Sequence, residues 1–227
     1  MKQTTMTITF KALAALLAYP SDDLVAALPE VLDVLEGDRR LPRRVRADLA
    51  ALVDELRSMD PLDAQERYVA TFDRGRAACL HLFEHVHGES RDRGQAMVDL
   101  KSMYERAGLA LAGHELPDYL PALLEFLSLQ PFEVAEAMLD DCAHVVRKVG
   151  DALASRGSSY AAVFAAILAV VDLPGLTGKA EAVDEKPMDE EWAEAPVVFG
   201  PAAGAACGAP MPAQSIIQFV PRAGEAR

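Results

Sequence analysis

Apolar residues recur at helical spacing from Phe10 to Val171, and this periodicity constrains the fold more than any other feature. After Pro42, for example, Val45, Leu49 and Leu52 follow at intervals of four and three residues and share one helix face. Similar stripes recur between short breaks, without strand–helix alternation or internal repeats. We therefore predict an all-α, multi-helix single domain, with Thr4–Phe10 a strand candidate on residue propensity alone.

Several residues mark where helices begin, end or bend. Ser21 is placed to cap a helix that carries Leu24 to Leu35, and Asp60-Pro61 supplies an N-cap followed by Pro at the first helical position. Pro29 is expected to break or kink the helix in which it lies. A later stripe, which contains Leu100 and Tyr104, is expected to stop at Gly108. The helix after Pro131 is expected to turn Val134 inward.

The composition changes near residue 178. Residues 179–195 contain two Lys and seven Asp or Glu, and the chain from Pro196 onward is rich in Ala, Gly and Pro. We therefore predict a helical domain at 1–176 and an acidic linker with a flexible tail at 177–227. Trp192, the only Trp, lies in this tail.

The charge balance excludes several classes of partner. Lys and Arg number 22 against 35 Asp and Glu, a net charge of −13, which argues against a general nucleic-acid binder. The arginine-rich stretch at 39–46 has no interleaved aromatic residue to stack on bases. No apolar run approaches the ~18 residues of a membrane span. The three Cys form no C-x-x-C pair. We predict a cytoplasmic protein that neither binds nucleic acid nor inserts into membranes.

Ionisable residues crowd between Asp73 and Arg93, and one pattern there suggests an enzyme. His81 to His85 spells H-x-x-E-H, which on a helix would place two imidazoles and Glu84 on one face, as in zinc metallopeptidases. The other interpretation places His85 and His87 in the last turn of a helix that ends at Gly88. Cys79 has no nucleophile elbow, and no phosphate loop is present. We predict no catalytic residue, metal or cofactor, with zinc peptidase as the alternative.

The same region resembles a known family. The resemblance lies in three stretches and extends to a tail motif: Phe72–Arg76, Leu82–Met97, Glu115–Pro121 and Trp192–Gly200. These are similar to the motifs of the respiratory nitrate reductase assembly chaperones, the NarJ type of the TorD-like group. The sequence departs from the family at Cys79 and His81, where Ser and an aliphatic residue are more common.

The resemblance implies a TorD/NarJ-like helical fold and a cofactor-free chaperone. Such proteins bind the apo catalytic subunit of nitrate reductase, including its N-terminal segment. They promote insertion of the molybdenum cofactor and iron–sulfur clusters before the subunit docks at the membrane. Molybdenum cofactor biosynthesis proteins are further candidate partners, and a different molybdoenzyme remains open as the client.

We expect a client-peptide groove near the Phe83–Arg93 segment and the Glu115–Pro121 loop. Apolar side chains would anchor a basic amphipathic segment there, and carboxylates would pair with its charges. The candidate client-binding residues are Leu80, Phe83, Glu84, His85, His87, Glu89, Asp118 and Tyr119. The candidate loop-organising residues are Asp73, Arg74, Arg76, Arg91, Asp92 and Arg93.

Overall fold

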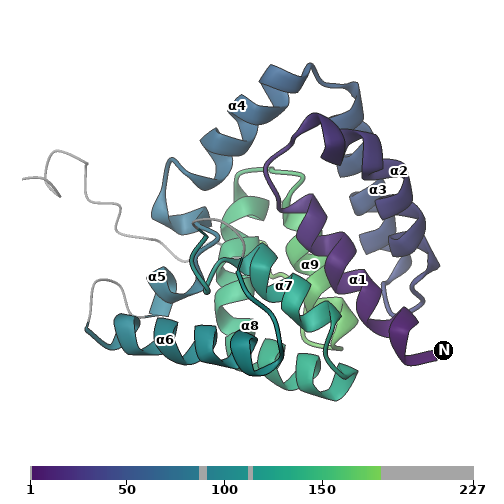
Figure 1. The fold of residues 1–227 in the computed structure, drawn as a ribbon. Coiled ribbons are helices and arrows are strands. Elements are labelled where there is room, and N and C mark those ends of the chain that lie inside the picture. The colour runs from purple at the N-terminus through teal and green to yellow at the C-terminus, as the bar shows by residue number, and fades with distance from the viewer. Residues whose placement is uncertain (1, 87–90, 112–114, 180–227) are drawn as a thin grey trace, which may run out of the picture. The chain divides into compact units, whose positions relative to one another are not determined.

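The computed structural model describes residues 2–86, 91–111 and 115–179, with the backbone only for residues 2–6 and 91. This part of the chain is helical, and its one β-bridge is an isolated antiparallel pair, His81 with Tyr119. The predicted all-α class is confirmed. The elements, in chain order, are α1 (Lys2–Leu16), α2 (Asp22–Gly37), α3 (Arg43–Ser58), α4 (Pro61–Phe72), the 3₁₀ turn η1 (Arg76–Ala78), α5 (Leu82–Val86), α6 (Arg91–Arg106), α7 (Leu120–Ser128), α8 (Phe132–Ser155) and α9 (Ala161–Val170) (Figure 1).

Helix α9 forms the centre of the core. Its ten residues are all apolar, and a helix that is apolar all round has to be buried on every side. It packs against α8, α3 and α1, and α1 in turn packs along α7. In Figure 1, α1 and α7 lie side by side in front of α8 and α9. The largest buried side chains include Phe10 of α1, Phe164 of α9 and Tyr160 just before it.

The caps are confirmed, but the expected strand at Thr4–Phe10 is wrong, and so is the expected break in the helix at Pro29. Ser21 Oγ accepts a hydrogen bond from Leu24 N at 3.2 Å, and Asp60 Oδ1 accepts one from Leu62 N at 2.9 Å. Helix α2 continues through Pro29, because its buried face packs against α1 and α3 on both sides of the exposed proline. The strand candidate Thr4–Phe10 is part of α1, since burial against the core outweighs weak β-propensity.

The end of the described chain is hydrogen-bonded to α8. Asp151 accepts hydrogen bonds from Thr177 N at 2.7 Å, Thr177 Oγ1 at 2.9 Å and Gly178 N at 2.8 Å. Gly150 permits this approach, because a Cβ there would lie 2.5 Å from a methyl of Leu176. Residues 177 and 178 are thus bound to the helical unit, while the division at 177 stays a prediction. Trp192 and the other residues of the predicted tail from 180 onward lie outside the described residues.

The exposure of Val134 and the apolar character of the helices test two further expectations. Val134 is 42% exposed, so the prediction that it faces inward is wrong; its neighbour Ala135 takes the buried position on α8. None of the described helices has the length and apolar character needed to cross a bilayer.

Candidate functional site

Two segments distant in sequence, 80–83 and 118–120, are joined by their backbones. Leu82 N donates to Asp118 O at 3.1 Å, and Leu120 N donates to Leu80 O at 2.9 Å. This pair of hydrogen bonds flanks the bridge between His81 and Tyr119. The two motifs of the sequence therefore meet in space, as predicted, with the start of α5 held against the start of α7.

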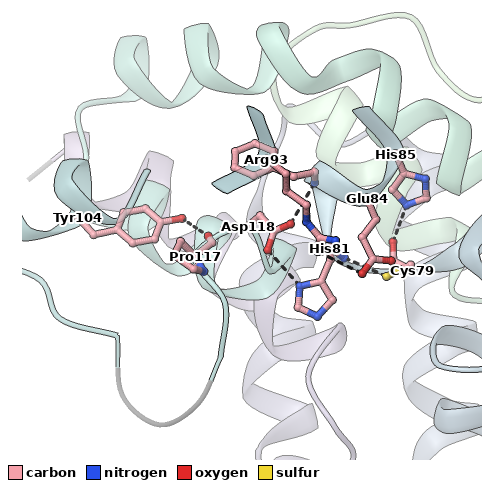
Figure 2. A network of polar contacts seen from close by, with 9 residues as sticks. Cys79, His81, Glu84, His85, Arg93, Tyr104, Pro117 and Asp118 are labelled. Atoms are coloured by element: carbon pink, nitrogen blue, oxygen red, sulfur yellow. Dashed lines mark hydrogen bonds and ion pairs between the residues drawn. The ribbon is translucent and has the colours of Figure 1, made fainter. Parts of the chain in front are cut away.

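Asp118 organises this junction from a fully buried position. Its exposed fraction is 0%, and its Oδ2 accepts a hydrogen bond from Phe83 N at 3.1 Å. That N–H lies in the first turn of α5, where backbone donors have no partner within the helix. Asp118 Oδ1 accepts a second hydrogen bond, from His81 Nδ1 at 3.2 Å (Figure 2). Asp118 thus caps α5 from another segment, and it is not the surface carboxylate expected to pair with a client.

Glu84 and His85 also make polar contacts near this junction. Arg93 of α6 pairs with Glu84 of α5 at 3.2 Å, as expected of a loop-organising arginine. His85 Nε2–H donates to the carbonyl oxygen of Cys79 at 2.8 Å. Burial raises the pKa of Cys79 to about 12, so its thiol is protonated and unreactive at neutral pH. Figure 2 shows these contacts around the His81–Asp118 pair.

This geometry does not support the zinc-peptidase interpretation. Helix α5 begins at Leu82, so His81 precedes it and does not share a helix face with Glu84 and His85. The ring of His81 binds Asp118, and that of His85 binds the Cys79 carbonyl. Among the described residues, no three His, Cys, Asp or Glu side chains are grouped so that they could hold a metal ion.

Beside the junction lies an apolar hollow of about 330 Å³, which we call the Tyr119 hollow. Tyr68 fixes one wall, because its hydroxyl donates to Leu17 O at 2.8 Å and lies 3.0 Å from the Tyr119 hydroxyl. Leu129, one of the lining residues, is 65% exposed and adds apolar surface at the border of the hollow. The lining residues are Ala18, Tyr104, Leu109, Ala110, Leu111, Glu115, Tyr119, Pro121, Ala122, Glu125, Phe126 and Leu129.

A second hollow of about 500 Å³ adjoins the first; we call it the Lys101 hollow. The two share Tyr104, Leu109–Leu111 and Glu115 in their linings, so they lie next to each other. The Tyr104 hydroxyl donates to Pro117 O at 2.8 Å and ties α6 to the loop before α7. The side chains found only in the Lys101 hollow are Met97, Val98, Lys101, Glu105, Leu116 and Pro117.

The predicted client-binding residues are therefore divided by the structure. Tyr119 lines the Tyr119 hollow, whereas Leu80 (4% exposed) and Asp118 are buried and cannot touch a client in this conformation. Phe83, Glu84 and His85 are half-buried at the junction and line neither hollow. His87 and Glu89 lie outside the described residues.

The structure does not show a loop-organising role for the other candidate residues. Asp73, Arg74, Arg76 and Asp92 are exposed, and the side chain of Arg91 is outside the described part. The prediction overlooked residues that line the hollows, among them Tyr104, Leu109, Glu125 and Leu129. One sequence signal could have identified Glu125: it is the only charged residue between Tyr119 and Phe132.

His81 and His85 are expected to influence stability with opposite dependence on pH. The hydrogen bond to Asp118 raises the pKa of His81, helped by the nearby carboxylates of Glu84 and Glu115. The contribution of His81 to the free energy of unfolding is complete below pH ~6.5, the pKa of this group in the unfolded chain. It is lost as pH rises through the pKa in the folded protein. Burial, together with Lys148, lowers the pKa of His85. The contribution of His85 to the free energy of unfolding is complete above pH ~6.5 and decreases as pH falls towards the pKa of His85 in the folded protein.

Urea unfolding of His81→Gln and His85→Gln at two pH values tests this. His81→Gln should cost on the order of 1–2 kcal/mol at about pH 5.5 and less at about pH 8, because it removes a charge-assisted hydrogen bond. The cost of His85→Gln should be larger at about pH 8. Costs that do not change with pH, or that change in the same direction for both variants, would contradict this assignment.

Comparison with known proteins agrees with the motifs. The family model described as nitrate reductase delta subunit matches residues 38–166. The Escherichia coli K12 nitrate reductase molybdenum cofactor assembly chaperone NarJ is 42% identical over 192 residues, which cover 81% of each chain. The assembly chaperone named NarJ in Bacillus subtilis strain 168 is 32% identical and aligns over 80% of this chain and 97% of its own.

A solved structure shares the fold. A redox enzyme maturation protein from Archaeoglobus fulgidus superposes with a TM-score of 0.52 at 20% sequence identity, over 71% of this chain and 91% of that one. The E. coli K12 chaperone named NarW is 38% identical over 80% of this chain and 74% of its own. The NarJ and NarW relatives are named as assembly chaperones, and the solved structure is named as a redox enzyme maturation protein. From the matched motifs, the helical fold and these identities together, we conclude that the chain belongs to the nitrate reductase delta subunit family and is an assembly chaperone of the NarJ type.

Proposed function

We propose that this protein binds the apo catalytic subunit of respiratory nitrate reductase, with the subunit's N-terminal segment seated in the Tyr119 hollow. Bound in this way, the subunit stays open for insertion of the molybdenum cofactor and iron–sulfur clusters before it docks at the membrane. Molybdenum cofactor biosynthesis proteins would then meet the client in this complex. The names of the relatives support nitrate reductase as the client.

The observation that carries this proposal is the Tyr119 hollow itself. Its volume of about 330 Å³ falls in the range of ~300–1,000 Å³ typical of ligand sites, and its lining is mostly apolar. Three of the described large apolar side chains that are exposed line the two hollows: Val98, Leu116 and Leu129. An amphipathic helix binds such a depression through apolar anchors at i, i+3, i+4 and i+7. A client segment whose apolar side chains are not yet buried in the finished enzyme could place them in this hollow.

Calorimetry with the full chain and a synthetic N-terminal peptide of the nitrate reductase catalytic subunit tests the proposal. We expect saturable binding with a dissociation constant of about 10 µM or below, or roughly −7 kcal/mol. A scrambled peptide of the same composition is the control. Absence of binding at millimolar peptide, or equal binding of the scrambled peptide, would contradict a specific site for this segment.

The identity of the client needs a separate experiment. The tagged full chain is purified from cells in which molybdenum cofactor synthesis is blocked, so that apo enzymes accumulate, and the bound proteins are identified by mass spectrometry. We expect enrichment of the nitrate reductase catalytic subunit over a tag-only control. Enrichment of another molybdoenzyme instead would show that the client is different although the fold is shared.

A further inference from the structure

Two described carboxylates of the motif, Glu84 and Asp118, already have partners within the protein. Glu84 is paired with Arg93, and Asp118 is buried in hydrogen bonds to His81 and Phe83. In the Lys101 hollow, Glu105 lies 3.9 Å from Lys101 in the next helical turn. Among the described residues, acidic recognition of a client in the hollows therefore depends on carboxylates other than Glu84, Glu105 and Asp118.

Two other carboxylates face the hollows. Glu115 lines both hollows and Glu125 lines the Tyr119 hollow, and both side chains are exposed. In the part of the chain that the structure describes, neither carboxylate has a hydrogen-bond or ion-pair partner, and Glu115 acts on His81 only through its charge at longer range. Lys101, the one cation among the lining residues that the structure describes, is already beside Glu105.

The position of Glu125 is not explained by the packing of α7. Helix α7 has six buried side chains and packs against α1 and α8, and Glu125, its only charged residue, lines the Tyr119 hollow. A charge among Pro121, Phe126 and Leu129 gains nothing from these apolar neighbours. When an occupant excludes water from this border, the attraction between a carboxylate and a cation becomes stronger than in bulk water.

We propose that Glu115 and Glu125 determine client specificity by pairing with Lys or Arg residues placed beside the apolar anchors of the bound segment. The inference rests on the proposed function, since it assigns the charge preference of the same hollow. Apolar burial supplies most of the affinity, and the two carboxylates reject segments whose flanking charges are negative. The occupant is thus an amphipathic helix with a cationic border.

Charge reversal on both sides of the contact tests this inference. The probes are the N-terminal peptide of the nitrate reductase catalytic subunit and a second peptide in which each of its Lys and Arg residues is replaced by Glu. Both are titrated into the full-length wild type, Glu115→Lys, Glu125→Lys and the double variant. Glu30→Lys is the matched control, because Glu30 is an exposed carboxylate on α2 that lines neither hollow. Circular dichroism confirms that each variant is folded.

We expect each reversal at Glu115 or Glu125 to weaken binding of the native peptide about tenfold, and Glu30→Lys to change it less than about twofold. The reversed peptide should bind the wild type at least about tenfold more weakly and should recover affinity with the double variant. If the native peptide binds every variant as it binds the control, the charge inference is overturned while the proposed function stands. If it fails to bind even the wild type, both are overturned.

Discussion

Asp118→Ala is expected to lower the free energy of unfolding by about 3 kcal/mol. The substitution leaves the Phe83 N–H without its acceptor and His81 without its carboxylate, in a place where the removed group was 0% exposed. An orphaned buried donor costs about 1–3 kcal/mol, and the lost charge-assisted hydrogen bond adds to it. Urea unfolding at about pH 6.5, followed by circular dichroism, measures the effect.

Two further variants separate the contributions of Asp118. Asp118→Asn keeps an oxygen that can accept from Phe83 N but loses the charge that faces His81, so it should cost about half as much. Asp140→Ala removes an exposed carboxylate of α8 and should stay within about 0.5 kcal/mol of the wild type. A cost below about 1 kcal/mol for Asp118→Ala would show that the junction does not depend on this carboxylate.

Ala122→Trp is expected to reduce the affinity for the client peptide more than about a hundredfold, a loss of roughly 2.7 kcal/mol or more. Ala122 lies on α7, is only half-buried and lines the Tyr119 hollow. An indole at this position would occupy space that the apolar anchors of the client need. Because the side chain is directed into the hollow and not into the core, the variant should remain folded.

Ala26→Trp supplies the matched control for this blocking experiment. Ala26 is an exposed residue of α2 that lines neither hollow, so a bulky side chain there should leave the affinity unchanged. The measurement is calorimetric titration of the same peptide into both variants. Equal affinities for Ala122→Trp and the wild type would place the peptide elsewhere on the surface.

The fold class could be predicted from the sequence because helical periodicity is a local signal that also marks burial. Leu49, Leu52 and Leu56 are predicted to share one face, and all three are buried in α3. The errors occur where tertiary packing outweighs local preference. The segment around Thr7 and Thr9 favours a strand by composition, yet both side chains are buried within α1, and Thr9 donates to Asp38 at 2.6 Å.

The candidate site was predicted only in part, for a physical reason. Motifs show which residues matter but not whether they face solvent or the interior. Asp118 and Glu125 are both carboxylates near apolar neighbours, and only the three-dimensional structure shows that the first caps α5 while the second borders a hollow. Likewise, the hydrogen bond from Tyr104 of α6 to Pro117, in the loop before α7, joins two separate segments. Helical periodicity in the sequence gives no sign of such a contact.

Site-specific photocrosslinking in cells tests the central claim most directly. A benzophenone amino acid is placed at Leu129, which is exposed on the border of the Tyr119 hollow, or at Leu62, which is 74% exposed on α4 and lines neither hollow. After irradiation, products are identified by mass spectrometry in cells that accumulate apo nitrate reductase. The account predicts a crosslink from position 129 to the N-terminal segment of the catalytic subunit and none from position 62. A crosslink from position 62 alone, or equal crosslinking from both, would contradict it.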